Sequence, residues 1–131
     1  MYILTIELNH ERKALESHIR NINEADEVNE YRRYLDCSRV DTATIDVEGH
    51  TYDVVHDDEA MFRSPLIPSL YISEEQVLFG NLAFVKTDEE GASVGLDLED
   101  MIRLLDFIDQ QKESLYRWTE QQMSQKQKMT A

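Results

Sequence analysis

The sequence of 131 residues has few of the residues that reactive or cofactor-binding sites commonly need. Its single cysteine, Cys37, excludes an internal disulfide framework, and its place at the end of an amphipathic segment is typical of a small buried hydrophobic residue rather than a nucleophile. Only four glycines are present, and the patterns GxSxG, GxxxxGKS/T and GxGxxG are all absent. We therefore expect a protein that is not an enzyme, with no catalytic residues and no cofactor.

Long apolar runs are also missing. No stretch approaches the roughly 20 apolar residues that a membrane span needs, and the segment Met1–Glu7 lacks the basic start and small-residue cleavage site of a signal peptide. We expect a cytoplasmic protein with no membrane association. The length and the even spread of apolar residues predict one globular domain over residues 1–123, followed by a frayed polar tail over residues 124–131.

Basic residues are scarce in the middle of the chain. The sequence has 13 Lys and Arg against 27 Asp and Glu, which gives a formal net charge of -14. Residues 41–100 contain 15 acidic residues and only two basic ones, Arg63 and Lys86, whereas the segments on either side are close to neutral. Such a field repels nucleic acid and anionic membranes and favours a basic partner, unless the acidity serves only solubility.

The first 40 residues combine an expected strand with expected helices. Alternating apolar residues over Tyr2–Leu8 predict a strand buried on both faces, and Asn9 is a suitable N-cap for a helix that begins at His10 or Glu11. The apolar positions of that helix repeat at helical spacing: Ala14, Leu15, His18, Ile19 and Ile22. A break is expected within residues 21–25, before a second helical stretch through Val28, Tyr31, Arg32 and Leu35. The pattern leaves open whether this is one bent helix or two.

After Arg39 the period of the pattern changes from helical to two. Residues 40–47 alternate as one strand, and residues 52–55 begin the return strand of a hairpin. Either Glu48–Gly49 or Gly49–His50 supplies the positive φ that a tight turn needs. This hairpin is the centre of the stretch Asp41–Gly95, around which the rest of the chain is expected to fold.

The second part of that stretch contains turns and one strongly apolar run. Residues 56–63 are expected to form a turn or one helical turn, and the prolines of the connector 64–69 exclude a central strand or helix there. The apolar run 77–86 predicts a central buried strand, in which Gly80–Asn81 indicates a bulge or a close backbone approach. Residues 88–91 then predict a turn, and residues 92–95 a short strand.

The last helix is expected to begin at Asp97 or Leu98, with acidic residues at its positive end. Its apolar stripe consists of Leu98, Met101, Ile102, Leu105, Ile108, Leu115, Trp118 and Met123. At a rise of about 1.5 Å per residue, such a helix extends beyond the edge of a small domain. Its later part is therefore a candidate contact for a homodimer or another partner, through Leu115, Tyr116 and Trp118.

Together these elements predict an α+β fold. We expect a single antiparallel sheet of four to five strands, with the N-terminal helical segment and the long C-terminal helix packed on one face. The other face and its loops then present the carboxylates to a partner. The predicted partner-binding residues are Asp46, Glu48, Asp53, Asp57, Asp58, Glu59, Asp88, Glu89 and Glu90.

Two further clusters contain residues of functional types. His56 and the acidic residues 57–59 lack the glycine-punctuated spacing of a calcium loop, and His10 and His18 lack an HExxH pattern, so we expect no metal site. The basic cluster consists of Arg20, Arg32, Arg33 and Arg39, with Tyr31 and Tyr34 beside it. Ion pairs with neighbouring Glu27, Glu30 or Asp36 explain this cluster, and a site for an anionic nucleotide signal is the alternative.

Several segments resemble a small family of acidic proteins. These segments are Val47–Val54, Asp57–Ala60, Val77–Val85, Asp88–Gly91 and Leu96–Asp100, which lie within residues 40–105. The family is a domain of unknown function found in phages, plasmids and conjugative elements of Gram-positive bacteria, and it has no established active site. The resemblance implies a mobile-element protein in the bacterial host cytosol, where many short acidic proteins disable host defences, some of them as mimics of DNA.

The function predicted from these observations is non-enzymatic inhibition. The chain is expected to bind a basic, nucleic-acid-binding host protein through its acidic surface, as an anti-CRISPR or anti-restriction protein does. It is not expected to bind nucleic acid or a membrane directly. The alternatives are a homodimeric accessory or regulatory protein of the element, whose acidity serves solubility, and a protein that binds a nucleotide signal.

Overall fold

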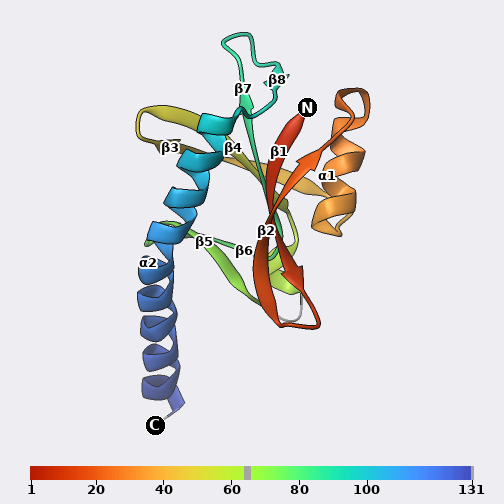
Figure 1. Ribbon diagram of the computed structural model, residues 1–131. Coiled ribbons are helices and arrows are strands. Elements are labelled where there is room, and N and C mark those ends of the chain that lie inside the picture. Colours follow the sequence, from red (N-terminus) through yellow and green to blue (C-terminus); the bar gives the residue numbers. More distant parts are fainter. Residues whose placement is uncertain (64–65, 131) are drawn as a thin grey trace.

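The structure is a computed structural model that describes residues 1–63 and 66–130, with side chains through residue 125 (Figure 1). In chain order its elements are β1 (Tyr2–Asn9), β2 (Ala14–Asn21), η1 (Glu24–Asp26), α1 (Glu27–Leu35), β3 (Val40–Val47), β4 (His50–Asp57), η2 (Ala60–Phe62), β5 (Pro68–Ser73), β6 (Gln76–Phe79), β7 (Leu82–Thr87), β8 (Ser93–Val94) and α2 (Leu98–Thr130). Neither helix in the described part of the chain is both long and apolar enough to cross a membrane.

The helix predicted from His10 is wrong, because residues 14–21 form the strand β2. Asn9 does nucleate a turn, since its side-chain oxygen accepts hydrogen bonds from the backbone N–H groups of Glu11 (3.0 Å) and Arg12 (3.1 Å). Lys13 then adopts a positive φ of 53°, and the chain returns along β1 with eight residues in antiparallel register. Of the five apolar positions assigned to that helix, only Ile22 is fully buried.

The second helical stretch is confirmed as α1. It follows the short 3-10 turn η1, whose N-cap Asn23 accepts a hydrogen bond from the backbone N–H of Ala25 (3.1 Å). Tyr31 and Leu35 are the buried side chains of α1. The segment predicted as one bent helix or two is therefore the strand β2 followed by the short turn η1 and the helix α1.

The central hairpin is confirmed as β3 and β4. These strands pair over eight residues each, from Val40 opposite Asp57 to Val47 opposite His50. Glu48 and Gly49 form the connecting two-residue turn with φ values of 52° and 80°. Positive φ at both central residues matches the right-handed twist of the flanking strands, which is why this turn type is favoured in hairpins.

The apolar run 77–86 forms two strands instead of the single one predicted. Gly80, with a φ of 74°, ends β6, and Asn81 precedes β7. The Asn81 side chain accepts a hydrogen bond from the backbone N–H of Leu8 (2.8 Å) and donates one to the carbonyl of Tyr34 (3.2 Å). These long-range bonds fix the chain where it leaves β6, which pairs with β5 in a separate two-stranded sheet.

The main sheet has six strands, more than the four to five predicted. Its order is β2-β1-β7-β4-β3, with β8 paired to β7, and all described neighbours are antiparallel. The central strand β7 is apolar on both sides. Leu82 and Phe84 belong to the core under α2, whereas Ala83 and Val85 belong to the core under α1.

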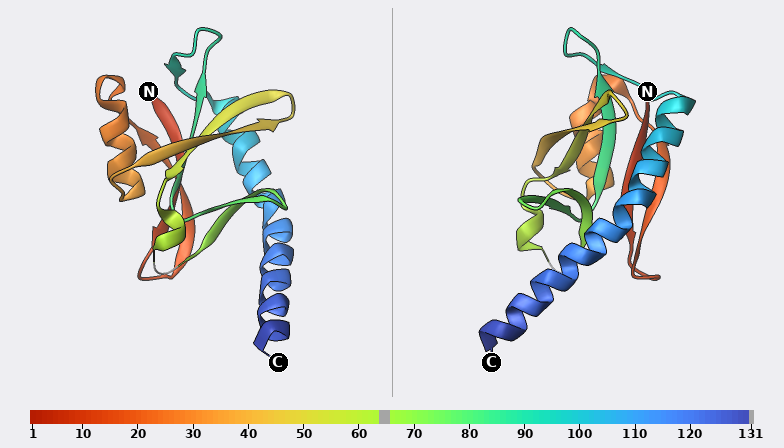
Figure 2. Two further views of the ribbon diagram at one scale, coloured as in Figure 1. Left: turned by 180° about the vertical axis from the view of Figure 1, so that it is seen from behind. Right: turned by 90° about the vertical axis from the view of Figure 1, so that its left-hand side faces the viewer.

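The two helices consequently cover opposite faces of the sheet, and the prediction that both pack on one face is wrong (Figures 1 and 2). The α1 side buries Ile3, Val55 and Val85 together with Tyr31 and Leu35. The α+β class and the long C-terminal helix are confirmed. Both faces of the central strands are covered, so most of the predicted carboxylates lie on the edge strand β3 and in the turns rather than on one open face. Asp53 is an exception, because it lies within β4 between β3 and β7.

The long helix α2 uses one side for packing. Met101 and Leu104 are buried against the main sheet, and farther along Trp118 packs edge-on against Phe79 of β6, with ring centroids 5.9 Å apart. The predicted apolar stripe is in fact two rows, because Leu98 and Ile102 are exposed. The polar tail predicted from residue 124 falls within the bounds of α2, and side chains from residue 126 onward lie outside the described residues.

A buried polar cluster joins the start of α2 to the sheet. The Asp100 carboxylate, which is 3% exposed, accepts hydrogen bonds from the Tyr52 hydroxyl (2.7 Å), the Lys86 ammonium (2.7 Å) and the Arg103 guanidinium (3.2 Å). Asp97 and Asp100 also accept bonds from each other's backbone N–H groups, as in a capping box. This cluster fixes the first turn of α2 over β4 and β7.

The same contacts shift the ionisation of the cluster. Burial by itself would raise the pKa of Asp100, but the hydrogen bonds from Lys86, the Asp97 backbone and Tyr52 outweigh burial and hold that pKa well below its usual range. Burial and the neighbouring Asp100 carboxylate raise the pKa of Tyr52 to about 12. At neutral pH the cluster therefore contains an ionised carboxylate and a neutral phenol.

Replacing Asp100 with Asn is expected to lower the free energy of unfolding by about 3 kcal/mol at pH 7, because it leaves the Lys86 charge without its partner. The folded-state pKa of Asp100 is depressed, so this contribution is complete above about pH 4, the ordinary aspartate value, and is lost as the pH falls further. Urea unfolding of the wild type and of Asp100→Asn at several pH values measures the difference.

The matched control is Glu99→Gln, which removes an exposed carboxylate from the same turn of α2. It is expected to change the free energy of unfolding by less than about 0.5 kcal/mol. A difference between wild type and Asp100→Asn that persists undiminished at pH 2 would contradict the assignment.

Candidate functional site

The predicted acidic residues separate into two groups along the sheet. The first, called the acidic end here, comprises the carboxylates of the β3–β4 hairpin and of the β7–β8 turn: Asp46, Glu48, Asp53, Asp88, Glu89 and Glu90. Because β7 runs antiparallel to β4, the turn before β4 and the turn after β7 lie toward the same end of this strand pair. The two turns diverge from there, since the β7–β8 turn points to the top and the hairpin turn to the right in the left view of Figure 2. The second group, Asp57, Asp58 and Glu59, lies at the opposite end of β4.

At the hairpin turn, one carboxylate supports the backbone and the next is presented to solvent. The Asp46 side chain accepts a hydrogen bond from the backbone N–H of Gly49 (3.0 Å), which stabilises the turn. Glu48 is exposed, and its nearest cation is Arg103, at 3.7 Å. Since Arg103 also binds the buried Asp100, it neutralises Glu48 only in part.

The β7–β8 turn has the same division of roles. One side-chain oxygen of Asp88 accepts hydrogen bonds from the backbone N–H groups of Glu90 and Ala92, both at 2.9 Å. Gly91 adopts the positive φ of 84° that closes the turn. Glu89 and Glu90 are exposed at its tip, so their carboxylates are presented to solvent.

The start of α2 adds acidic side chains that the sequence analysis did not assign to this surface. Glu99 and Asp106 lie with Glu48, Ile102 and Arg103 around a shallow depression. The sequence indicated only that acids near residue 97 suit a helix start. Their position beside the hairpin depends on how α2 crosses the sheet, and no local pattern reports that crossing.

Helix α1 contributes another acidic residue missed from sequence. The Tyr31 hydroxyl donates a hydrogen bond to Glu27, and Asp53 lies close enough for its charge to act on the same phenol. Burial, then Glu27, then Asp53 raise the pKa of Tyr31. Glu27 and Asp53 therefore both act on the phenol of Tyr31, although 25 residues separate them in the chain.

The second acidic group is largely structural. Asp57 is buried, forms an ion pair with Arg63, and accepts a hydrogen bond from the backbone N–H of Glu59 (2.9 Å). Asp58 lies 4.0 Å from Arg39. Asp57 thus holds the loop that leads into η2, and only Asp58 and Glu59 are exposed for a partner.

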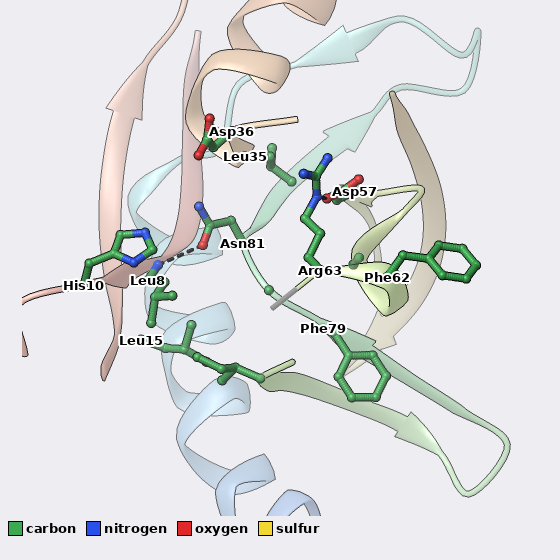
Figure 3. Close-up of a pocket in the computed structure, with 13 residues that line it drawn as sticks. Leu8, His10, Leu15, Leu35, Asp36, Asp57, Phe62, Arg63, Phe79 and Asn81 are labelled. Carbon is green, nitrogen blue, oxygen red and sulfur yellow. Dashed lines mark hydrogen bonds and ion pairs between the residues drawn. The ribbon is translucent and has the colours of Figure 1, made fainter. Parts of the chain in front are cut away.

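A pocket of about 340 Å³ lies between the β1–β2 hairpin, the end of α1 and η2 (Figure 3). The apolar side chains of Leu8, Leu15, Leu35 and Phe79 line it, and Asn81 and the Asp57–Arg63 ion pair supply polar groups. No pattern in the sequence predicted this pocket. Asn81 and Asp57 are already bound to other protein groups, so the polar residues that line this pocket stabilise the fold.

The residues weighed for metal binding or nucleophilic chemistry do not assemble. Among the described residues, no three His, Cys, Asp or Glu side chains are placed to hold a metal ion. Cys37 is half-buried near Asp57. Burial and then the Asp57 charge raise the pKa of its thiol, which disfavours the reactive thiolate.

The basic cluster is engaged within the protein. Arg20 forms two hydrogen bonds to Glu7, both at 2.9 Å, and its guanidinium stacks 4.9 Å from the centre of the Tyr34 ring. Arg33 covers the same ring at 5.0 Å and lies 3.5 Å from Glu30. These pairings match the interpretation of the cluster as ion pairs, although Glu7 was not among the predicted partners.

The predicted dimer residues divide between two sides of α2. Leu115 and Trp118 are half-buried on the side that packs against the β5–β6 sheet. Tyr116 is exposed on another side. The three residues therefore do not form one contact surface.

Comparison with known proteins adds no relative to this description. No protein-family model matches the chain, and neither a curated protein nor a solved structure matches it.

Proposed function

We propose that this chain is a non-enzymatic protein of a mobile genetic element that binds and inhibits a nucleic-acid-handling protein of the host. The contact surface in this proposal is the acidic end, together with Glu27, Glu99 and Asp106 beside it. The supporting observation is that Glu48 of the hairpin turn lies with Glu99 and Asp106 of α2 around one depression, and that the β7–β8 turn follows the strand paired with β4. Glu27 of α1 and Asp53 of β4 both act on the Tyr31 phenol.

The local charge balance supports this contact. The two cations nearest to these carboxylates, Lys86 and Arg103, are both bound to the buried Asp100 carboxylate. Asp100 offsets one of these two positive charges, so one positive charge remains against the six carboxylates of the acidic end, which keep a negative field. A surface of this sign attracts the lysines and arginines that line a channel for the phosphate backbone.

The division of roles in each turn supports specific rather than diffuse contact. Asp46 and Asp88 hold their turns through backbone hydrogen bonds, which orders the neighbouring exposed residues Glu48, Glu89 and Glu90. Carboxylates on an ordered backbone turn lose less conformational entropy on binding than the same groups on a flexible tail. The surface is thereby suited to imitate the fixed charges of a nucleic acid, as an anti-CRISPR or anti-restriction inhibitor of the DNA-mimic type requires.

The proposal predicts that charge reversal at the turn tips abolishes inhibition while the fold is kept. The test captures proteins from a Gram-positive bacterial lysate, identifies those that bind DNA, and measures whether this chain competes with duplex DNA for the purified protein. The triple variant Glu48→Lys, Glu89→Lys, Glu90→Lys is expected to weaken that competition about tenfold or more.

The matched control is Glu11→Lys, Glu74→Lys, Glu75→Lys, which makes the same charge change at exposed positions away from the acidic end. This control is expected to compete within about twofold of the wild type, since only the net charge changes. Equal losses of competition in both triple variants would show that the net charge of the protein, rather than the acidic end, determines binding, and would reject the proposal. A captured protein that binds this chain and DNA simultaneously would also reject the proposal.

Salt dependence gives a second prediction. A complex formed between the acidic end and a basic channel weakens as ionic strength rises, because salt screens exposed charges. Isothermal titration at low and high salt is expected to show a steep loss of affinity for the wild type and a shallower one for the Glu48, Glu89, Glu90 variant. Affinity that is independent of salt would contradict a charge-driven contact.

A further inference from the structure

The side of α2 that does not pack on the body carries its own row of apolar side chains. Their exposed fractions are 73% for Leu98, 60% for Ile102, 40% for Leu105, 68% for Tyr116 and 60% for Met123. The buried row of the same helix, which includes Met101 and Leu104, faces the sheet instead. The described structure thus leaves apolar side chains in contact with solvent in the first part and the later part of α2, with the charged Asp109 and Lys112 between them.

The spacing of this row is that of a coiled coil. Steps of four and three residues alternate along the positions Leu98, Ile102, Leu105, Asp109, Lys112, Tyr116, Thr119 and Met123, which are called the α2 seam here. The two charged residues stand together at its centre. The Thr119 hydroxyl donates to the carbonyl of Leu115 (2.9 Å), which leaves the Thr119 methyl group available for packing.

We propose that two copies of this chain associate through the α2 seam as an antiparallel pair of helices. A two-fold axis between Gln110 and Gln111 makes the seam self-complementary, as a symmetric dimer requires. Leu98 then faces Met123 of the partner subunit, and Leu105 faces Tyr116 of the partner subunit. In heptad terms, Ile102, Asp109, Tyr116 and Met123 occupy a positions, and Leu98, Leu105, Lys112 and Thr119 occupy d positions. Each a residue then faces a d residue of the partner subunit, as in antiparallel coiled coils.

The central charges select this orientation. In the antiparallel pair, Asp109 faces the partner's Lys112, and the same contact occurs twice by symmetry. A parallel pair would place Asp109 against the partner's Asp109 and Lys112 against the partner's Lys112. In the single chain these side chains are 74% exposed and only 3.2 Å apart, so they are free to exchange an intrachain ion pair for an interchain one.

The shape of the chain supports the same arrangement. The first part of α2 lies across the main sheet, and its last part extends away from the body (Figures 1 and 2). In an antiparallel pair, the extended part of each helix covers the exposed Leu98, Ile102 and Leu105 of the other copy. The seam from Leu98 to Met123 is about 38 Å long at the usual helical rise, so both parts fit along one contact.

The flanking charges make this contact sensitive to salt. On the solvent side the positions directly beside the seam are acidic, namely Glu99, Asp106, Glu113 and Glu120, and of these Glu113 is paired with Arg117 at 3.1 Å. Antiparallel pairing brings these like charges near one another, which opposes association until salt screens them. Dimerisation is therefore expected to strengthen with ionic strength, whereas binding by the acidic end weakens with it. This opposite dependence separates a failure of one proposal from a failure of the other.

The test measures mass by sedimentation equilibrium over a range of protein concentrations, at low and high salt. The wild type is expected to approach twice its mass of 15.4 kDa as concentration rises, with more dimer at high salt. Asp109→Lys and Lys112→Asp are each expected to weaken dimerisation about tenfold or more, because each creates two like-charge contacts. The double variant restores opposite charges and is expected to restore the dimer.

Glu11→Lys and Lys13→Asp are matched controls, since they make the same charge changes on the exposed β1–β2 turn and are expected to leave the mass unchanged. Thermal unfolding checks that every variant is folded. Orientation is read from disulfide formation in a Cys37→Ala background, where mixed Leu105→Cys and Tyr116→Cys chains are expected to crosslink with each other. A monomeric wild type, single variants that dimerise normally, a double variant that does not recover, or Leu105→Cys crosslinking with itself would each overturn the proposal.

Discussion

Burial of β7 on both of its faces is the constraint on which the rest of the structure depends. Leu82 and Phe84 require a cover on one side of the sheet, and Ala83 and Val85 require one on the other. A single layer of helices cannot provide both covers, so α1 and α2 pack on opposite faces. The flanking strands β1 and β4 also bury apolar residues on both faces, with Ile3 and Leu4 in β1 and Val54 and Val55 in β4. The outer strands β2 and β3 are the more polar ones.

Local patterns were sufficient for elements that one strong signal specifies. The period of two around Glu48–Gly49 predicted the hairpin, and helical spacing predicted α1 and the long last helix. The same reasoning failed at β2. Leu15, Ile19 and Ile22 are spaced as on one face of a helix, but Leu15 and Ile19 are also spaced as on one face of a strand. Pairing with β1 decided between the two, and such pairing has no local signature.

The candidate site was predictable as a set of residue types but not as a surface. Counting charges identified the acidic segment, yet strand register separates its residues between two ends of the sheet. Asp57 illustrates the difference, because a carboxylate expected at a partner contact proved to be buried against Arg63. Glu27, Glu99 and Asp106 were missed for the converse reason, since only the packing of the helices brings them beside the hairpin.

The Asp100 cluster fixes the first turn of α2 to the sheet directly beside the acidic end. In an antiparallel pair the two first turns lie at opposite ends of the seam, about 38 Å apart along its axis. Each dimer would then present two identical sets of turn-tip carboxylates, Glu48, Glu89 and Glu90, held at a fixed distance by a rigid helical rod, whereas Glu99 and Asp106 border the seam. A target with two binding channels at a matching separation, or a dimeric target, would be bound with avidity beyond the strength of either contact alone.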